Sequence, residues 1–170
     1  EYSFMVEEKF NNRKIIDFLL CQGLSKEIVQ KVKFGGVFID GVRINNVNTL
    51  VKTSSVVKIV LPPDEVNPYI TPTKDNLEII YEDEYLLCVF KESGVLTHSS
   101  RGNDLVSLEQ LVCGYMNSPF TFRAINRLDR DTSGIVLIAK DMVSACFLNK
   151  QMKAGNIKKS YYAIVDGNLP

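Results

Sequence analysis

The sequence predicts an α+β protein in which a small helical and hairpin domain precedes a larger domain built on a largely antiparallel or mixed sheet. Apolar runs of strand length outnumber helical patterns, and hairpin-type connections join them. Four prolines between positions 62 and 72 disfavour helix and central strand, and they stiffen an extended tether. We therefore expect one domain at 1–62, a linker at 63–75 and a second domain at 76–170.

Two short helices are expected first. Residues 15–20 carry the apolar pattern of one helix, which Gly23 ends. Ser25 is placed to cap a second helix, which runs as far as the Gly35-Gly36 pair. Together these segments predict a compact helix-turn-helix unit.

A hairpin follows the helices. Asp40-Gly41 is the strongest short turn signal in the chain, because hairpin turns favour residues that tolerate positive φ. Strands are expected on either side, at 37–39 and 42–44, and another at 56–61. The side chains that helices and strands can bury together are Phe18, Leu19, Ile28, Val32, Phe34, Val37 and Ile39.

The second domain alternates strand and helix patterns. Short apolar runs favour strands, and two longer periodic segments favour helices. The expected elements are strands near 77–81 and 86–91, a helix near 104–115, an extended run at 122–125, a strand at 135–139, a helix near 142–154 ended by Gly155, and a strand at 157–165.

The densest group of reactive side chains lies in the loop at 126–134, which carries four charged residues between two apolar runs. A loop held between core strands is a rigid platform for catalytic side chains. An EF-hand is excluded, because Lys140 stands where that loop closes with glutamate and strands flank the segment. A solvated charged turn in which Asp129 or Asp131 binds loop amides stays open as an alternative.

The net charge of zero hides a regional asymmetry. Residues 9–60 carry nine Lys and Arg against three Asp and Glu, a charge of +6, whereas residues 61–125 carry −6 and residues 126–170 carry +3. This distribution favours an anionic partner that meets the N-terminal domain and the loop. Ordinary surface patterning is the alternative.

Nothing in the sequence indicates a membrane or a metal site. No apolar stretch approaches the length of a membrane span and no charged-then-apolar leader is present, so we expect a cytoplasmic protein. The cysteines have no paired metal-ligand spacing and His98 is the single histidine, so no metal is expected. Reduced core thiols are expected at Cys21, Cys88, Cys113 and Cys146.

The segment NRLDRDTSGIVLIAK at 126–140 resembles the H-R-L-D-x-x-T-S-G signature of the RluA-type pseudouridine synthases, with Asn126 in place of the usual histidine. LEIIYEDEYLLCVFKESGVLTHSS at 77–100 resembles the opening hairpin and following loop of that family, and KKSYYAIVDG at 158–167 fits its K-x-Y-x-A-x-V-x-G strand. The resemblance covers about 76–170. The family's catalytic domain continues further, with a basic residue that pairs with its aspartate, so activity of these 170 residues alone is an open question.

The first domain carries a second resemblance. Residues 9–61 resemble the ribosomal S-four-type RNA-binding fold, a helix-turn-helix followed by a hairpin. In that fold the second helix and the hairpin present basic side chains to structured RNA. The resemblance implies RNA contacts from Lys26, Lys31, Lys33 and Arg43.

The RluA-type resemblance implies isomerisation of uridine to pseudouridine in structured RNA, either rRNA or tRNA. Asp129 matches the catalytic aspartate nucleophile, which can stabilise or trap charge on the ribose. Arg127 matches an arginine that helps to flip the base and contacts phosphate; its alternative is a surface ion pair with Asp131. Tyr161 matches a tyrosine that lies against the base and can take its carbon-5 proton; its alternative is a core aromatic.

No cofactor is expected, because the base leaves and rejoins the same ribose without net consumption of any reagent. We expect the protein to act on RNA as a monomer. The rival function is that of an RNA-binding, translation-associated module whose synthase-like region no longer catalyses.

Overall fold

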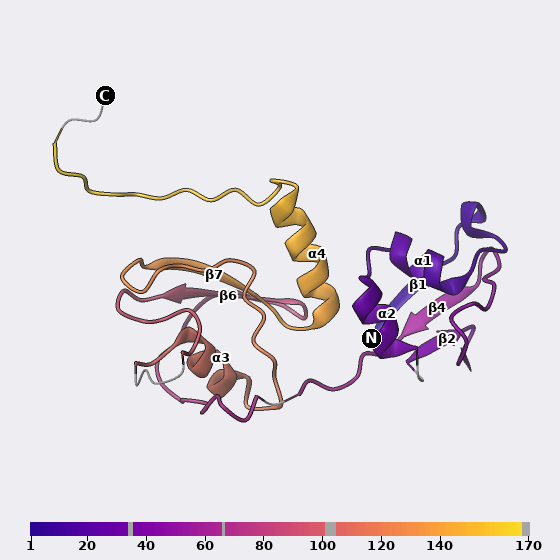
Figure 1. Ribbon diagram of the computed structural model, residues 1–170, viewed down its shortest axis with the longest axis horizontal. Coiled ribbons are helices and arrows are strands. Elements are labelled where there is room, and N and C mark those ends of the chain that lie inside the picture. The colour runs from indigo at the N-terminus through magenta and orange to yellow at the C-terminus, as the bar shows by residue number, and fades with distance from the viewer. Residues whose placement is uncertain (34–35, 66, 101–104, 168–170) are drawn as a thin grey trace.

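The computed structural model describes residues 1–33, 36–65, 67–100 and 105–167, and it contains two antiparallel sheets (Figure 1). Each sheet contributes to its own hydrophobic core together with helices. The expected α+β class is confirmed, and the strands of both sheets pair antiparallel.

The N-terminal unit is a four-stranded sheet with two helices packed on it (Figure 1). Its strand order is β1-β4-β2-β3, so the central strands come from distant parts of the unit. The elements are β1 (Tyr2–Met5), a short 3-10 helix (Glu8–Phe10), α1 (Ile15–Cys21), α2 (Lys26–Val32), β2 (Val37–Ile39), β3 (Val42–Arg43) and β4 (Val56–Ile59).

Local signals place the helices and the hairpin of this unit. Ser25 caps α2, because its hydroxyl accepts the Ile28 N–H at 3.2 Å. Asp40 and Gly41 have φ values of 48° and 80°, the positive φ that the two-residue hairpin turn requires. Of the expected core side chains, Phe18, Leu19, Ile28, Val32 and Val37 are buried, Ile39 is partly buried, and Phe34 lies outside the described residues.

The first strand, β1, is not predicted by the sequence. It pairs with β4, with Tyr2 opposite Ile59 and Met5 opposite Val56. Its side chains alternate between partly buried and exposed, which is the pattern of a strand with one covered face. Four residues are too few for this alternation to stand out in a sequence.

The second unit is a three-stranded sheet in the order β5-β6-β7, with α3 packed against one face (Figure 1). The core of this unit lies between the sheet and α3. It contains Leu87 and Val89 of the central strand, Val136 of the strand that follows the loop, and Leu108 and Val112 of α3. The elements are β5 (Glu78–Glu82), β6 (Leu86–Lys91), α3 (Leu108–Met116), β7 (Gly134–Ala139) and α4 (Met142–Lys153).

The third helix begins later than the sequence predicts. Ser107 and Gln110 form a capping box: the Ser107 hydroxyl accepts the Gln110 N–H at 3.2 Å, and the Gln110 side chain accepts the Ser107 N–H at 3.0 Å. This reciprocal cap starts α3 at Leu108, whereas Asp104, near the expected start, lies outside the described residues.

Residues 157–165 do not form the expected strand. The segment follows α4 without regular structure, and Tyr162 and Ile164 are fully exposed. A strand requires a neighbour whose backbone groups pair with its own. No strand in the described ranges runs beside this segment, which is why its β-type pattern does not become a strand.

The proline-rich linker has neither helix nor strand in its described residues, yet it is attached to the second unit. The Arg123 guanidinium pairs with the Asp64 carboxylate, and both side chains are only 14% exposed. The Thr73 N–H donates to the carbonyl of Gln110 at 3.0 Å. Gly114 of α3 allows this approach, because a Cβ there would lie 2.2 Å from the Thr73 carbonyl oxygen. The linker is therefore anchored along the second unit and is not a free tether.

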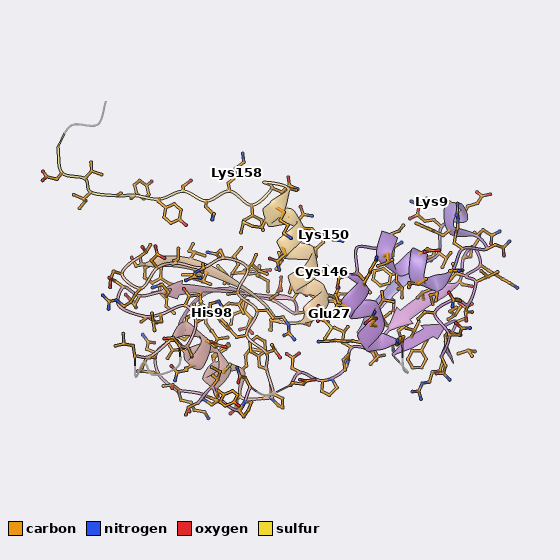
Figure 2. The ribbon with its side chains drawn as sticks, in the orientation of Figure 1. Lys9, Glu27, His98, Cys146, Lys150 and Lys158 are labelled. Atoms are coloured by element: carbon orange, nitrogen blue, oxygen red, sulfur yellow. The ribbon has the colours of Figure 1, made fainter. Side chains whose placement is uncertain are left out.

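The last helix, α4, follows β7 in the second unit and packs against the N-terminal unit. Its apolar side chains pack against the N-terminal core, and Cys146 and Lys150 lie on the side toward α1 and α2 (Figure 2). Lys150 Nζ donates to the Gly23 carbonyl at 2.6 Å. The Tyr2 hydroxyl of β1 donates at 2.7 Å to Asp141, whose carboxylate also caps α4.

Candidate active site

The charged loop at 126–134 connects two paired segments. The segment before it lies along the outer edge of β7, and the loop then leads into the start of β7. The run at 122–125, which is expected to be extended, pairs with β7 through one bridge and a 2.8 Å bond from the Ile125 N–H to the Leu137 carbonyl. Gly134 has a φ of 141°, a conformation that favours glycine, and it begins β7. Both ends of the loop are thus fixed to the sheet.

The segment after β6 holds the loop from another direction. Thr97 Oγ1 donates to the Leu128 carbonyl at 2.7 Å and accepts the Leu128 N–H at 3.2 Å. Both backbone groups of the residue before Asp129 are therefore bound by one buried hydroxyl. Ser93 Oγ donates to the Asp131 carbonyl at 3.0 Å, further along the loop.

Lys91, the last residue of β6, is 1% exposed. Its ammonium donates to the carbonyl oxygens of Glu92, Val95 and Arg130 at 2.9, 2.7 and 3.0 Å. The Arg130 carbonyl also accepts the Gly94 N–H at 2.9 Å. Burial lowers the pKa of Lys91, and nearby carboxylates partly oppose that shift.

Asp129 lies between these anchored positions, and its side chain is exposed. Residues 91–97, which we call the strap, bind Leu128 on one side of it and Arg130 on the other. No hydrogen bond or ion pair engages the Asp129 carboxylate within the described part of the chain. A fixed backbone and an unengaged carboxylate are the properties that a nucleophile requires.

Asp131 has a different environment. Arg130 donates to both of its carboxylate oxygens, from Nε at 2.8 Å and from a terminal nitrogen at 2.9 Å. These bonds hold the pKa of Asp131 below its ordinary value. Arg127 is exposed. Its alternative role, an ion pair with Asp131, is not observed, because Asp131 pairs with Arg130.

A cavity of about 710 Å³ lies beside the loop, within the size range of small-molecule sites. One wall comes from the loop and the start of β7, and the other comes from the segment after α4, which Lys158 marks in Figure 2. Tyr161 lines this second wall and is 59% exposed, so it is not a core aromatic. Leu128 and Asp131 line the cavity, whereas Asp129 does not.

The four predicted RNA contacts of the N-terminal unit lie elsewhere. None of Lys26, Lys31, Lys33 and Arg43 lines the cavity beside the loop. The Lys31 ammonium lies 3.6 Å from the Glu27 carboxylate, in an exposed pair one helical turn apart. Lys31 also borders a crevice of about 750 Å³ between α2 and the linker.

The described ranges contain no group of three or more His, Cys, Asp or Glu side chains that could hold a metal ion. They also contain no helix long and apolar enough to cross a bilayer. The four cysteines are free thiols, but Cys21 is exposed at the end of α1, so the expectation of a buried thiol there is wrong.

Lys91 and Thr97 are the residues of this region that sequence reasoning misses. A lysine at the end of a strand ordinarily reaches solvent, and a threonine in a loop has no distinguishing pattern. The one available signal is the spacing of Lys91 and Gly94, which lie within the hairpin segment that resembles the family. That spacing does not show that the ammonium turns inward.

Comparisons with known proteins show similarity to RNA pseudouridine synthases. The family described as RNA pseudouridylate synthase matches residues 85–170. An uncharacterized RNA pseudouridine synthase of Bacillus subtilis, YjbO, is 30% identical over 152 residues, which is 86% of this chain and 53% of that protein. Ribosomal large subunit pseudouridine synthase C of Haemophilus influenzae is 31% identical over 174 residues, 95% of this chain and 53% of that protein.

A solved structure, human RNA Pseudouridylate Synthase Domain Containing 4, aligns with a TM-score of 0.35 and 21% identity over 46% of this chain and 30% of that chain. The chain spans about half the length of the curated relatives it matches. The family match covers the strap, the loop and the segment that carries Tyr161, and on this ground the chain belongs to the RNA pseudouridylate synthase family.

Proposed function

We propose that this protein is an RNA pseudouridine synthase that isomerises uridine to pseudouridine in structured RNA, with rRNA as the substrate class. The observation that carries the proposal is the exposed Asp129 carboxylate on a loop whose neighbouring backbone positions are bound by the strap. The rRNA assignment rests on a relative named as a ribosomal large subunit pseudouridine synthase.

The reaction exchanges one bond for another. The bond from ribose carbon 1 to the base nitrogen breaks, the base turns, and a bond from carbon 1 to base carbon 5 forms. The proton on carbon 5 leaves and the freed nitrogen gains one, so nothing is consumed. Asp129 supplies the negative charge or the nucleophile that this step requires, as the carboxylates of glycosidases do.

The target uridine must leave its stack before the carboxylate can reach it. We assign Arg127 to flipping the base and contacting phosphate, since it lies two residues before Asp129 and is exposed. Tyr161 borders the cavity beside the loop and is assigned to stacking on the extruded uracil. The cavity lies between the loop and the segment that carries Tyr161, and it offers space for a base.

The direct test is release of tritium from RNA that contains carbon-5-labelled uridine, incubated with the full-length protein. Isomerisation removes the label from carbon 5, whereas binding alone releases none. RNA that binds without tritium release would favour the rival function, a non-catalytic RNA-binding module associated with translation.

Tyr161→Phe tests the role of the hydroxyl. The ring that stacks on uracil is kept, so RNA affinity should stay within a few-fold of wild type. If the hydroxyl takes the carbon-5 proton, turnover falls by about 10²-fold or more, and this is the result we expect. Tyr115→Phe is the control, because Tyr115 on α3 does not line the cavity beside the loop. An unchanged rate for Tyr161→Phe would restrict Tyr161 to stacking.

For the N-terminal unit we propose an S-four-type RNA-binding role. The support is its pair of short helices followed by a hairpin, together with the charge of +6 over residues 9–60. The ion pair between Lys31 and Glu27 is solvent-exposed and contributes little, so it leaves the lysine able to exchange its partner for phosphate.

Replacing Lys31 and Lys33 together by Ala should weaken binding to many structured RNAs. Each phosphate contact releases roughly one counterion, so loss of two contacts flattens the log–log salt dependence by about two units. Lys14→Ala with Lys52→Ala removes the same charge from exposed positions of the same unit. Equal slopes for the two double variants would show that net charge, and not contact by α2, sets the affinity.

A further inference from the structure

The outer edge of β7 is paired by two different kinds of partner. Toward the end of the strand, backbone groups of the preceding segment pair with it: the Ile125 N–H donates to the Leu137 carbonyl at 2.8 Å, and the Ala139 N–H donates to the Arg123 carbonyl at 2.9 Å. Toward its start, the partner is the side chain of Asn126. Asn126 Nδ2 donates to the Ile135 carbonyl at 3.0 Å, and Asn126 Oδ1 accepts the Leu137 N–H at 2.9 Å.

The Asn126 carboxamide has a donor and an acceptor on one carbon, so it can replace the peptide groups of a paired strand. It continues the ladder of hydrogen bonds for two further groups of β7 after the backbone has turned away. A strand edge would otherwise leave these groups without a protein partner. The backbone at position 126 is thereby released from the sheet, and the charged residues of the loop begin at position 127.

We propose that Asn126 is a positioning residue. Its side chain fixes the point at which the preceding backbone stops pairing with β7, and it thereby places Arg127 and Asp129. The proposal rests on the proposed function and deepens it. The strap binds the loop at Leu128 and Arg130, and the carboxamide binds it at the start, so the loop is held on both sides of Arg127 and Asp129.

The position of Asn126 in the site supports a role beyond stability. It lines the 710 Å³ cavity, and it also lines a neighbouring cavity of about 320 Å³ together with Arg127 and His98. It therefore borders both cavities, and Arg127 lines the smaller one. A shift of the backbone at Asn126 would displace Arg127 and Asp129 together, and misplacement by about 1 Å can cost about 10²-fold in rate.

The test compares Asn126→Ala and Asn126→Asp in the full-length protein. Alanine removes both bonds, whereas aspartate keeps an acceptor for the Leu137 N–H but loses the donor to the Ile135 carbonyl. We expect kcat to fall by about 10- to 100-fold for alanine and by less for aspartate, with the dissociation constant for RNA within about threefold of wild type. If the alanine variant does not fold, the aspartate variant decides.

A second readout separates positioning from simple stability. Hydrogen exchange at the Leu137 amide should become faster in Asn126→Ala, because that amide loses its acceptor. Asn149→Ala is the matched control, since Asn149 Nδ2 donates to the Ala145 carbonyl within α4, away from the loop. Its kcat and its Leu137 exchange should match wild type.

The outcomes are distinguishable. A folded Asn126→Ala variant with faster exchange at Leu137 and wild-type kcat would overturn the positioning role. Equal losses of kcat in Asn126→Ala and Asn149→Ala would also overturn it, because the effect would then be general. Absence of tritium release from the wild-type protein would instead reject the proposed function itself.

Discussion

Asp129→Asn is expected to abolish isomerisation by the full-length protein, with a rate at least about 10³-fold lower, while RNA affinity stays within a few-fold. The asparagine has nearly the same shape but lacks the charge that stabilises the ribose as its bond to the base breaks. Because the strap binds backbone groups on both sides, the loop should keep its conformation. Tritium release measures the rate, and a filter-binding titration measures the affinity.

Asp131→Asn is the internal control for this prediction. Asp131 is held by Arg130 and is exposed, so its loss should change the rate by less than about tenfold. Activity of Asp129→Asn equal to that of the wild type would move the nucleophile elsewhere. If Asp131→Asn were the inactive variant, Asp131 would be the candidate, since it lines the cavity.

The choice between the two aspartates shows what the sequence alone can decide. Charge pattern and spacing leave Asp129 and Asp131 equivalent, and only the resemblance to a family separates them. The structure adds a physical difference, because Arg130 engages Asp131, while the Asp129 carboxylate forms no hydrogen bond or ion pair with the described residues. The catalytic assignment itself stays a prediction until the variants are measured.

Elements with local signals could be predicted from the sequence. The turn at Asp40-Gly41 depends on two adjacent residues, and the cap of α2 depends on Ser25 and the residues just after it. The strands β6 and β7 are continuous apolar runs and form where they are expected. In each case the stabilising interaction joins residues close together in the sequence, or the element is marked by a run of apolar residues.

Features that depend on distant partners could not be predicted. The strap bonds from Thr97 and Lys91 join residues 31 and 39 positions apart, and no periodicity encodes them. The segment at 157–165 has a strand pattern but no neighbouring strand in the described ranges, so propensity alone does not settle its structure. The side-chain pairing of Asn126 with β7 likewise needs the two segments to be adjacent first.

Lys91→Met is expected to lower the free energy of unfolding of the full-length protein by about 2–3 kcal/mol. The methionine fills similar space and removes the cost of burying an ammonium group, but it loses hydrogen bonds from a charged donor, worth about 1.5–3 kcal/mol each. The carbonyls of Glu92 and Val95 lose this bond, whereas the Arg130 carbonyl keeps the Gly94 N–H. Chemical denaturation followed by circular dichroism measures the change.

The matched control for this prediction is Lys153→Met, because Lys153 is exposed in the last turn of α4. A surface substitution of this kind should change stability by less than about 0.5 kcal/mol. Equal stability of Lys91→Met and wild type would mean that water replaces the ammonium at the carbonyls, and the strap would then be held mainly by the Thr97 hydroxyl. Because Thr97 still binds Leu128 in either case, the folded Lys91→Met protein should retain measurable tritium release below its unfolding transition.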